Sequence, residues 1–197
     1  MTQARHPDRP PDVARLLAAL NSHGVRYVLV GSVAAQVYGA EVQPGDLDIT
    51  PALDRENLVR LCNLLLALEA TLPDTDDVGH WQVQPDGEKK WISRPATPQD
   101  LLERARWQPD PDDVSSLDHL MHTRHGNLDV VPDLTGDYET LMKRAVRMEA
   151  HGQEVWVVHV DELLTALTVL RRKKDVPRVR QLRQIQRRRG EGTEHGT

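Results

Sequence analysis

Apolar residues recur along the first part of the chain with the period of a helix and then with that of a strand. Val13, Leu16 and Leu20 stand at helical spacing and predict a helix over 11–23. The continuous apolar run at 27–30 predicts a strand at 26–30 that is buried on both faces. A short helix should follow at 33–38, because glycine at position 39 can end it.

The rest of the chain predicts further helices and strands. Alternating polar and apolar residues predict a strand at 46–50, and leucines at helical spacing predict a helix at 54–70. For 71–98, which is rich in Asp, Pro and Gly, weak strands and a flexible excursion fit equally well. Later helices are expected at 98–105, 138–148 and 161–170, a hairpin at 117–131 with its turn at 124–127, a strand at 154–160, and a basic helix or frayed tail at 176–189.

This order of elements predicts an α+β fold, with a mixed β-sheet flanked by helices and further helices at the C-terminal end. A chain of 197 residues is long enough for one compact unit. Within it we expect a core at 1–135, followed by a C-terminal helical region with a basic tail at 136–197.

Composition narrows the class of protein. Apolar residues make up 39% of the chain and charged residues 28%, which is typical of a globular protein. The longest apolar run, at 64–68, is far shorter than the roughly 18 residues that span a bilayer. Residues 1–11 contain no apolar segment of the secretory type. We therefore expect no membrane association and a cytoplasmic location.

Charge is distributed unevenly. The chain carries a net charge of -5, yet the segment 171–189 contains ten Lys or Arg residues and a single acid, Asp175. Such a basic segment attracts polyanions, and nucleic acid is the common one in the cytoplasm. A solvated helix tail would have the same composition, so both interpretations stay open.

Two carboxylates predict a metal site. Asp46 and Asp48 stand two residues apart on a predicted strand, so both project from one face. Adjacent like charges favour a bound cation, and Mg²⁺ or alternatively Mn²⁺ prefers such oxygen ligands. Asp129 is the candidate for a third carboxylate, because it alternates with apolar residues on another predicted strand. Taken alone, an Asp-x-Asp pair is more often a solvated feature at a strand end.

A possible phosphate-binding corner precedes these acids. Gly31 and Ser32 end the buried strand and open the next helix, where free backbone N–H groups can bind a phosphate oxygen. Glycine permits close approach, and the Ser32 hydroxyl adds a donor. A phosphate cradle beside metal-binding carboxylates indicates nucleoside triphosphate chemistry.

These motifs resemble those of the DNA polymerase beta-like nucleotidyltransferase superfamily: a strand, Gly-Ser, a short helix and then Asp-x-Asp. Within it, the chain looks like the toxin-type branch of toxin–antitoxin systems, the AbiEii and MenT-like toxins. The features that carry this resemblance are Gly31-Ser32, Ala34, Gly39, Asp46-Leu47-Asp48, Asn57-Leu58, Gly126-Asn127-Leu128-Asp129 and Arg172-Lys173-Lys174-Asp175. Two departures stand out. Val42 and Pro44 replace an Arg-x-Thr, and the helix at 161–170 lacks a lysine near Leu167 or Thr168.

The resemblance implies a nucleotidyltransferase-like fold and assigns roles to residues. Asp46 and Asp48 would hold Mg²⁺, and Asp129 would join them and help activate the acceptor hydroxyl. Gly31 and Ser32 would grip the triphosphate. Arg172 and Lys174, with Arg171 as a further candidate, would supply the nucleotide-binding cations that the missing lysine leaves out.

The resemblance also implies a function. Nucleotide transfer from a nucleoside triphosphate, such as CTP, to the 3′ end of tRNA would block aminoacylation and growth. It implies a cognate antitoxin protein as partner, which in some relatives phosphorylates a residue near the active site, here Ser32. Two alternatives remain. One is transfer to a protein or to a small molecule such as an aminoglycoside, and the other is an inactive fold that binds RNA or a partner.

Overall fold

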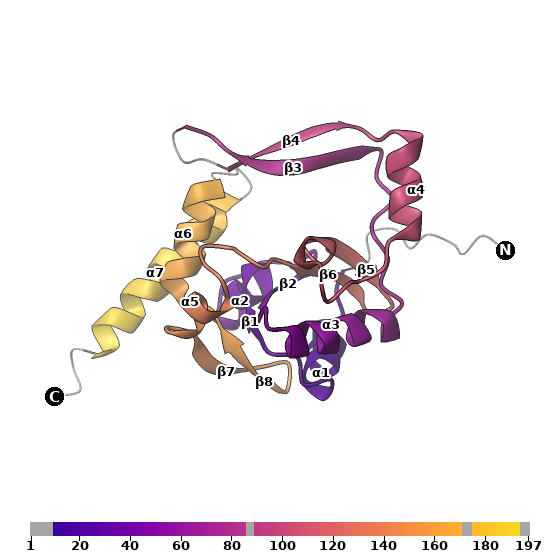
Figure 1. The fold of residues 1–197 in the computed structure, drawn as a ribbon. Coiled ribbons are helices and arrows are strands. Elements are labelled where there is room, and N and C mark those ends of the chain that lie inside the picture. The colour runs from indigo at the N-terminus through magenta and orange to yellow at the C-terminus, as the bar shows by residue number, and fades with distance from the viewer. Residues whose placement is uncertain (1–9, 86–88, 171–174, 194–197) are drawn as a thin grey trace.

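A mixed β-sheet forms the centre of the protein, and a two-stranded hairpin forms a second, smaller sheet (Figure 1). The computed structural model describes residues 10–85, 89–170 and 175–193. The strands are β1 (Tyr27–Leu29), β2 (Leu47–Pro51), β3 (Asp77–Val83), β4 (Lys89–Pro95), β5 (Leu120–Thr123), β6 (Gly126–Val130), β7 (Val146–Ala150) and β8 (Gln153–Val157). The helices are α1 (Val13–Ser22), α2 (Gly31–Val37), α3 (Arg55–Ala67), α4 (Pro98–Arg106), α5 (Tyr138–Met142), α6 (Val160–Leu170) and α7 (Val176–Thr193), with a 3₁₀ turn at Val114–Ser116.

The predicted α+β class is confirmed. The central sheet has six strands in the order β5-β6-β2-β1-β8-β7, and helices flank it, with α6 and α7 at the C-terminal end. The helix at α3 begins where its sequence predicts, because the Asp54 side chain accepts a hydrogen bond of 3.2 Å from the Asn57 N–H. Its buried leucines, among them Leu61 and Leu65, each contribute about 2 kcal/mol by leaving water.

Asn57 ties α3 to the start of β1. Its side chain is fully buried, and its Oδ1 accepts a hydrogen bond of 2.6 Å from the Arg26 N–H. Its Nδ2 donates to the carbonyl oxygens of Arg26, at 2.9 Å, and Ala52, at 2.8 Å. Every polar atom of this buried amide is therefore paired, so Asn57 has a structural role in joining three segments.

The pairing of β2 with β6 decides where the acidic side chains point. The two strands run parallel, and Asp48 lies directly opposite Asp129. Leu47 and Ile49 are fully buried, as are the residues opposite them on β6. Because successive residues of a strand point to opposite faces, Asp48 and Asp129 share the other face. The register thus places two of the predicted carboxylates side by side.

The segment at 138–148 corrects the prediction of one helix. α5 ends at Met142, and 146–150 forms β7, which pairs with β8 through a tight turn at His151 and Gly152. Both turn residues have positive φ, 50° and 76°. This hairpin extends the central sheet beyond β1, so the region 136–197 contributes strands as well as helices. The boundary at residue 135 stays a prediction.

The two other uncertain regions form hairpins. Within 71–98 the chain folds into β3 and β4, which pair in register from Asp77 opposite Pro95 to Val83 opposite Lys89. Thr97 and Asp100 then form a reciprocal cap that starts α4. In the hairpin of β5 and β6, the second strand already begins at Gly126, two residues earlier than expected. Figure 1 shows β3 and β4 lying across the top of the body, linked to it by α4.

No helix among the described residues combines the length and the apolar character that a bilayer crossing requires.

Candidate active site

Asp46, Asp48 and Asp129 converge on one site, as the sequence leads us to expect. Each has a carboxylate oxygen within 4.8 Å of those of the other two, and all three side chains are half-buried. Asp46 directly precedes β2, Asp48 lies on it, and Asp129 lies opposite on β6. The proximity follows from the strand spacing of two residues and from the parallel register of β2 and β6.

The electrostatics of this cluster favour a cation. Burial raises the pKa of Asp48 well above its ordinary value, and the charges of Asp46 and Asp129 raise it further. Burial also raises the pKa of Asp129 to about 7, with contributions from Asp46 and Asp118. Because three close carboxylates repel one another in a partly desolvated place, a bound divalent cation would relieve the cost of ionising them.

The donor set fits Mg²⁺ or Mn²⁺. Three carboxylates supply the hard oxygen ligands that these ions prefer. Oxygen ligands of one such ion lie about 3 to 4 Å apart, so oxygens within 4.8 Å need small side-chain rotations to reach a shared ion. Asp46, Asp48 and Asp129 can therefore hold a divalent metal without rearrangement of the strands.

The Gly31–Ser32 corner packs directly against Asp48. α2 begins at Gly31, two residues before the predicted start, and the Ser32 N–H donates a hydrogen bond of 3.3 Å to Asp48 Oδ2. Gly31 has φ of +65°, and a Cβ on it would lie only 2.0 Å from Asp48 Oδ2. The absence of a side chain at Gly31 is therefore required by the carboxylate itself. That these residues bind phosphate stays a prediction.

Ser32 is buried behind this corner. Its side chain is 5% exposed, and its hydroxyl has no hydrogen-bond partner among the described residues. Such an orphaned hydroxyl costs free energy unless a further group pairs with it. In this conformation a modifying enzyme cannot reach the Ser32 hydroxyl without displacement of α2.

Two hydrogen bonds hold the loop that leads to the acids, and the sequence did not reveal either of them. Asn127 Nδ2, on β6, donates to the Gly45 carbonyl oxygen at 3.2 Å, and Gln181 Oε1, on α7, accepts from the Glu41 N–H at 2.8 Å. Asn127 stood in a predicted turn, whereas the structure places it 8% exposed within β6. Asn127 stands two residues before Asp129, and this spacing on a strand could have suggested that the two side chains share a face.

The predicted cations at Arg172 and Lys174, and the further candidate Arg171, lie outside the described residues. The described basic residue whose charge acts on the acids is Arg178, in the first turn of α7, which lowers the pKa of Asp48. The sequence prediction placed Arg178 within a basic helix or tail without separating it from its neighbours.

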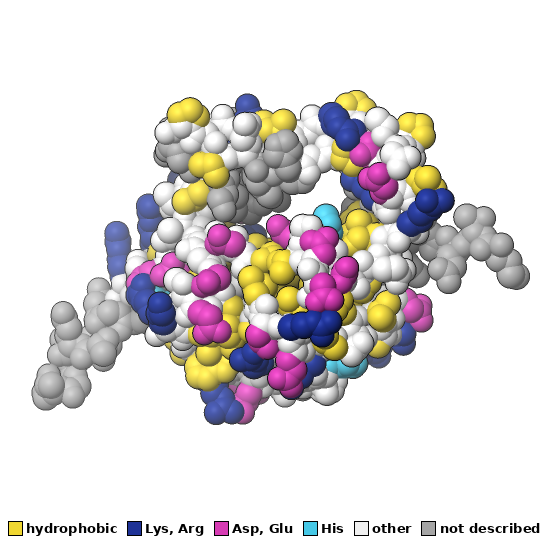
Figure 2. Space-filling view, viewed as in Figure 1, with side chains coloured by type: hydrophobic (Ala, Val, Ile, Leu, Met, Phe, Trp, Pro, Cys, Tyr) yellow, Lys and Arg dark blue, Asp and Glu magenta, His cyan; other side chains and the backbone are white. Residues whose placement is uncertain are grey.

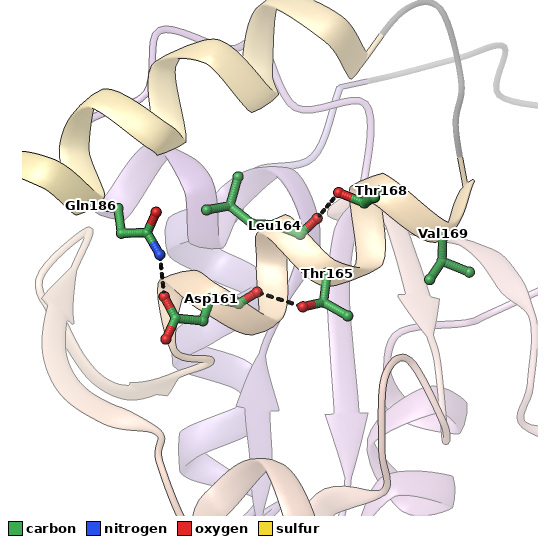
Figure 3. Close-up of a pocket in the computed structure, with 6 residues that line it drawn as sticks. All are labelled: Asp161, Leu164, Thr165, Thr168, Val169 and Gln186. Carbon is green, nitrogen blue, oxygen red and sulfur yellow. Dashed lines mark hydrogen bonds between the residues drawn. The ribbon is translucent and has the colours of Figure 1, made fainter.

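A groove of about 360 Å³ lies between α6 and α7, and none of the predicted site residues lines it. Its polar groups are already paired, as Figure 3 shows. The Thr165 hydroxyl donates to the Asp161 carbonyl oxygen at 2.9 Å, and the Thr168 hydroxyl donates to that of Leu164 at 2.7 Å. Gln186 Nε2 donates to Asp161 Oδ1 at 2.6 Å. The groove is thus the seam where α7 packs on α6.

Comparison with known proteins adds little. No protein-family model matches the chain, and no curated protein matches it. Among solved structures, the chain is similar to the crystal structure of a "putative nucleotidyltransferase" from Thermotoga maritima, with 15% identity and a TM-score of 0.45 over 96% of this chain and 99% of that one. A likeness of this strength carries no argument about activity.

Proposed function

We propose that the protein is a metal-dependent nucleotidyltransferase. The observation that carries this proposal is the cluster of Asp46, Asp48 and Asp129, whose carboxylate oxygens lie within 4.8 Å of one another beside the Gly31–Ser32 corner. The motif resemblance implies roles for the same three residues. Asp46 and Asp48 would hold Mg²⁺, with Asp129 as the third carboxylate.

The chemistry is transfer of a nucleotide to a hydroxyl group. The acceptor oxygen forms a bond to the α-phosphorus of a nucleoside triphosphate, the bond from that phosphorus to the bridging oxygen breaks, and pyrophosphate leaves. Asp129 orients the acceptor hydroxyl and takes up its proton. A divalent metal held by Asp46, Asp48 and Asp129 would neutralise charge on the phosphates. The remaining task of the protein is positioning, for which β2 and β6 provide a rigid base.

An RNA acceptor, specifically the 3′ end of tRNA, agrees with the charge of α7. Arg180, Arg183 and Arg187 are exposed and follow one another by three and four residues, so they form one basic helix face. α7 is also the helix that anchors the loop before Asp46. Figure 2 shows acidic side chains gathered on the face below the β3–β4 hairpin and an open space between hairpin and body.

Label transfer tests the proposal. Purified protein is incubated with Mg²⁺, total tRNA and each α-labelled nucleoside triphosphate in turn, with CTP as the expected donor. We expect label on the tRNA 3′ end. Label on a protein or on an aminoglycoside would instead favour the alternative acceptors. RNA binding without any label would favour the inactive fold and reject the proposed activity.

The toxin role and the antitoxin partner extend the proposal into the cell. Transfer to tRNA 3′ ends blocks aminoacylation, so expression of the protein in the cytoplasm should arrest growth, and a cognate antitoxin should relieve the arrest. The burial of Ser32 favours an antitoxin that acts by binding over one that modifies this hydroxyl in the closed site.

Neutralising the arginines of the basic face of α7 should weaken RNA binding and make the binding affinity less dependent on salt concentration. In the Arg180→Gln, Arg183→Gln, Arg187→Gln triple variant, three phosphate contacts are lost, so the slope of log affinity against log salt concentration should fall by about 2 to 3. Fluorescence titration with tRNA at several salt concentrations measures this slope. The matched control removes three arginines that form ion pairs elsewhere, namely Arg15, Arg55 and Arg147. Equal slopes in the two variants would exclude α7 as the RNA surface.

A further inference from the structure

The first turns of α7 are fixed against the loop that leads to the acidic cluster. Leu182 is fully buried, and Gln181 holds the backbone of Glu41 in the loop that leads to Asp46. Farther along α7, the Gln186 side chain donates a hydrogen bond to the Asp161 side chain on α6, as Figure 3 shows. α7 is therefore docked on two elements, and the residues one turn before Leu182 have a defined position.

Arg178 lies one turn before Leu182 and is largely buried. Its side chain is 20% exposed, whereas the neighbouring Arg180 and Arg183 are exposed. Its Nε is buried and has no hydrogen-bond partner among the described residues. Its ion pair with Asp175 joins Nη1 and Oδ1 at 3.7 Å, which is too long for a hydrogen bond. The guanidinium is thus partly buried, and its Nε donor has no hydrogen-bond partner among the described residues.

Burial of an arginine with unmet donors is costly, and this cost suggests a ligand. An unpaired buried donor costs about 1 to 3 kcal/mol, and more when it is charged. Arg178 precedes Gln181 by about one turn of α7, and Gln181 is hydrogen-bonded to the loop that leads to Asp46. The start of α7 is therefore packed against the loop before the metal-binding acids, where a group with several anionic oxygens would complete the hydrogen bonds of the guanidinium.

We propose that Arg178 binds the β- and γ-phosphates of the donor nucleoside triphosphate. This assignment rests on the proposed function and deepens it. A guanidinium presents a planar fork of donors that matches two phosphate oxygens. Asp175, which is 1% exposed, carries a carboxylate oxygen 3.7 Å from Nη1 of this guanidinium. Arg178 then supplies from α7 the positive charge that the resemblance leads one to expect from a lysine on α6.

Nucleotide binding by Arg178→Gln tests the assignment. The probe is the non-transferable α,β-methylene analogue of CTP with Mg²⁺, measured by isothermal titration calorimetry. We expect the Kd of the analogue to rise by about 10- to 100-fold, because charged hydrogen bonds are lost. The Kd of CMP, which lacks both distal phosphates, should stay unchanged. Arg178→Lys keeps the charge without the fork and should recover part of the affinity.

Arg15→Gln, which removes one positive charge from α1, is the matched control and should bind the analogue as the wild type does. An unchanged Kd for the analogue in Arg178→Gln would overturn the assignment. So would an equal loss of affinity for the analogue and CMP, because that indicates a structural role.

If wild-type protein transfers label but Arg178→Gln binds the analogue normally, only this assignment fails. If wild-type protein binds the analogue and transfers no label, the proposed function fails and Arg178 is judged by binding alone. If wild-type protein binds no analogue, both fail.

Discussion

The Asp48→Asn variant should lose nucleotide transfer and, in the absence of divalent metal, be more stable than the wild type. Transfer should fall by about 1,000-fold or more, because a bound metal ion contributes several kcal/mol of charge stabilisation. Stability should rise because the substitution removes one of three mutually repelling carboxylates. Most substitutions of buried polar residues destabilise a protein, so the gain would be diagnostic.

The gain in stability should depend on pH. In the metal-free protein the pKa of Asp48 is raised well above its ordinary value, and that of Asp129 is raised to about 7. From about pH 4 upward, the unfolded chain releases protons that the folded protein retains, so the free energy of unfolding falls as pH rises. This contribution is fully present below the ordinary pKa of Asp and is lost as pH rises through the raised pKa of each group, which for Asp129 is about 7. Asp48→Asn should therefore match the wild type near pH 4 and exceed it most at pH 8.

Thermal unfolding with and without Mg²⁺ measures both effects. At pH 8 and a Mg²⁺ concentration of about 100 times Kd, the wild-type Tm should rise by about 5 to 10 °C. The Tm of Asp48→Asn should rise far less, because one ligand is missing. Asp76→Asn makes the same charge change at an exposed position and should leave activity and the Mg²⁺ response intact. An equal Mg²⁺ response in Asp48→Asn and wild type would contradict the metal site.

The sequence predicts most of this site because the information is local. Asp46 and Asp48 share a face by strand geometry alone, and Gly31-Ser32 follows a buried apolar run. The position of Asp129 needs the register of β2 against β6, which the sequence does not encode locally. Alternation with apolar neighbours on both strands was sufficient to suggest it, because buried apolar faces restrict the register to steps of two residues.

β7 was missed because two periodicities compete in a short segment. The residues 138–148 contain enough helix-favouring side chains to extend α5, yet Arg147 and Glu149 alternate with the more buried Met148 and Ala150. Pairing with β8 decides between the two, and pairing is a tertiary interaction. Propensity over one segment cannot anticipate it.

Arg178 was missed for a related reason. The segment 171–189 contains ten basic residues that look alike in composition, and those on α7 differ by the face of the helix on which they lie. The buried positions Arg178 and Leu182 are one turn apart, whereas Arg180 and Arg183 face solvent. Only the docking of α7 on the loop at Glu41 and on α6 separates these two sets.

The Gly31→Ala variant should disrupt the site, because the added methyl group would collide with the side chain of Asp48. A Cβ on Gly31 would lie 2.0 Å from Asp48 Oδ2 and 2.7 Å from Asp48 Cβ. Asp48 is a short side chain on a central strand and cannot move away without a shift of β2 or α2. The φ of +65° adds the cost of a left-handed conformation, about 1 to 2 kcal/mol. We expect the backbone strain and the steric overlap together to reduce the free energy of unfolding by about 2 to 5 kcal/mol.

The Gly31→Ala variant should also lose nucleotide transfer by about 100-fold or more, since even a displacement of about 1 Å at a catalytic group can have that effect. Urea denaturation and label transfer measure the two losses. Gly39→Ala is the matched control, because Gly39 also has a positive φ, +100°, but no atom would lie within 4 Å of its Cβ. It should show conformational strain alone and keep its activity.

A double-mutant cycle separates the steric cause from a general loss of stability. Asp48→Gly removes all three atoms that a Cβ on Gly31 would meet, so in that background Gly31→Ala should cost only the strain of positive φ, about 1 to 2 kcal/mol. The difference between the two costs is the coupling energy between Gly31 and Asp48. Equal costs in both backgrounds would mean that Asp48 does not pack against the corner, and the site would have to be built differently.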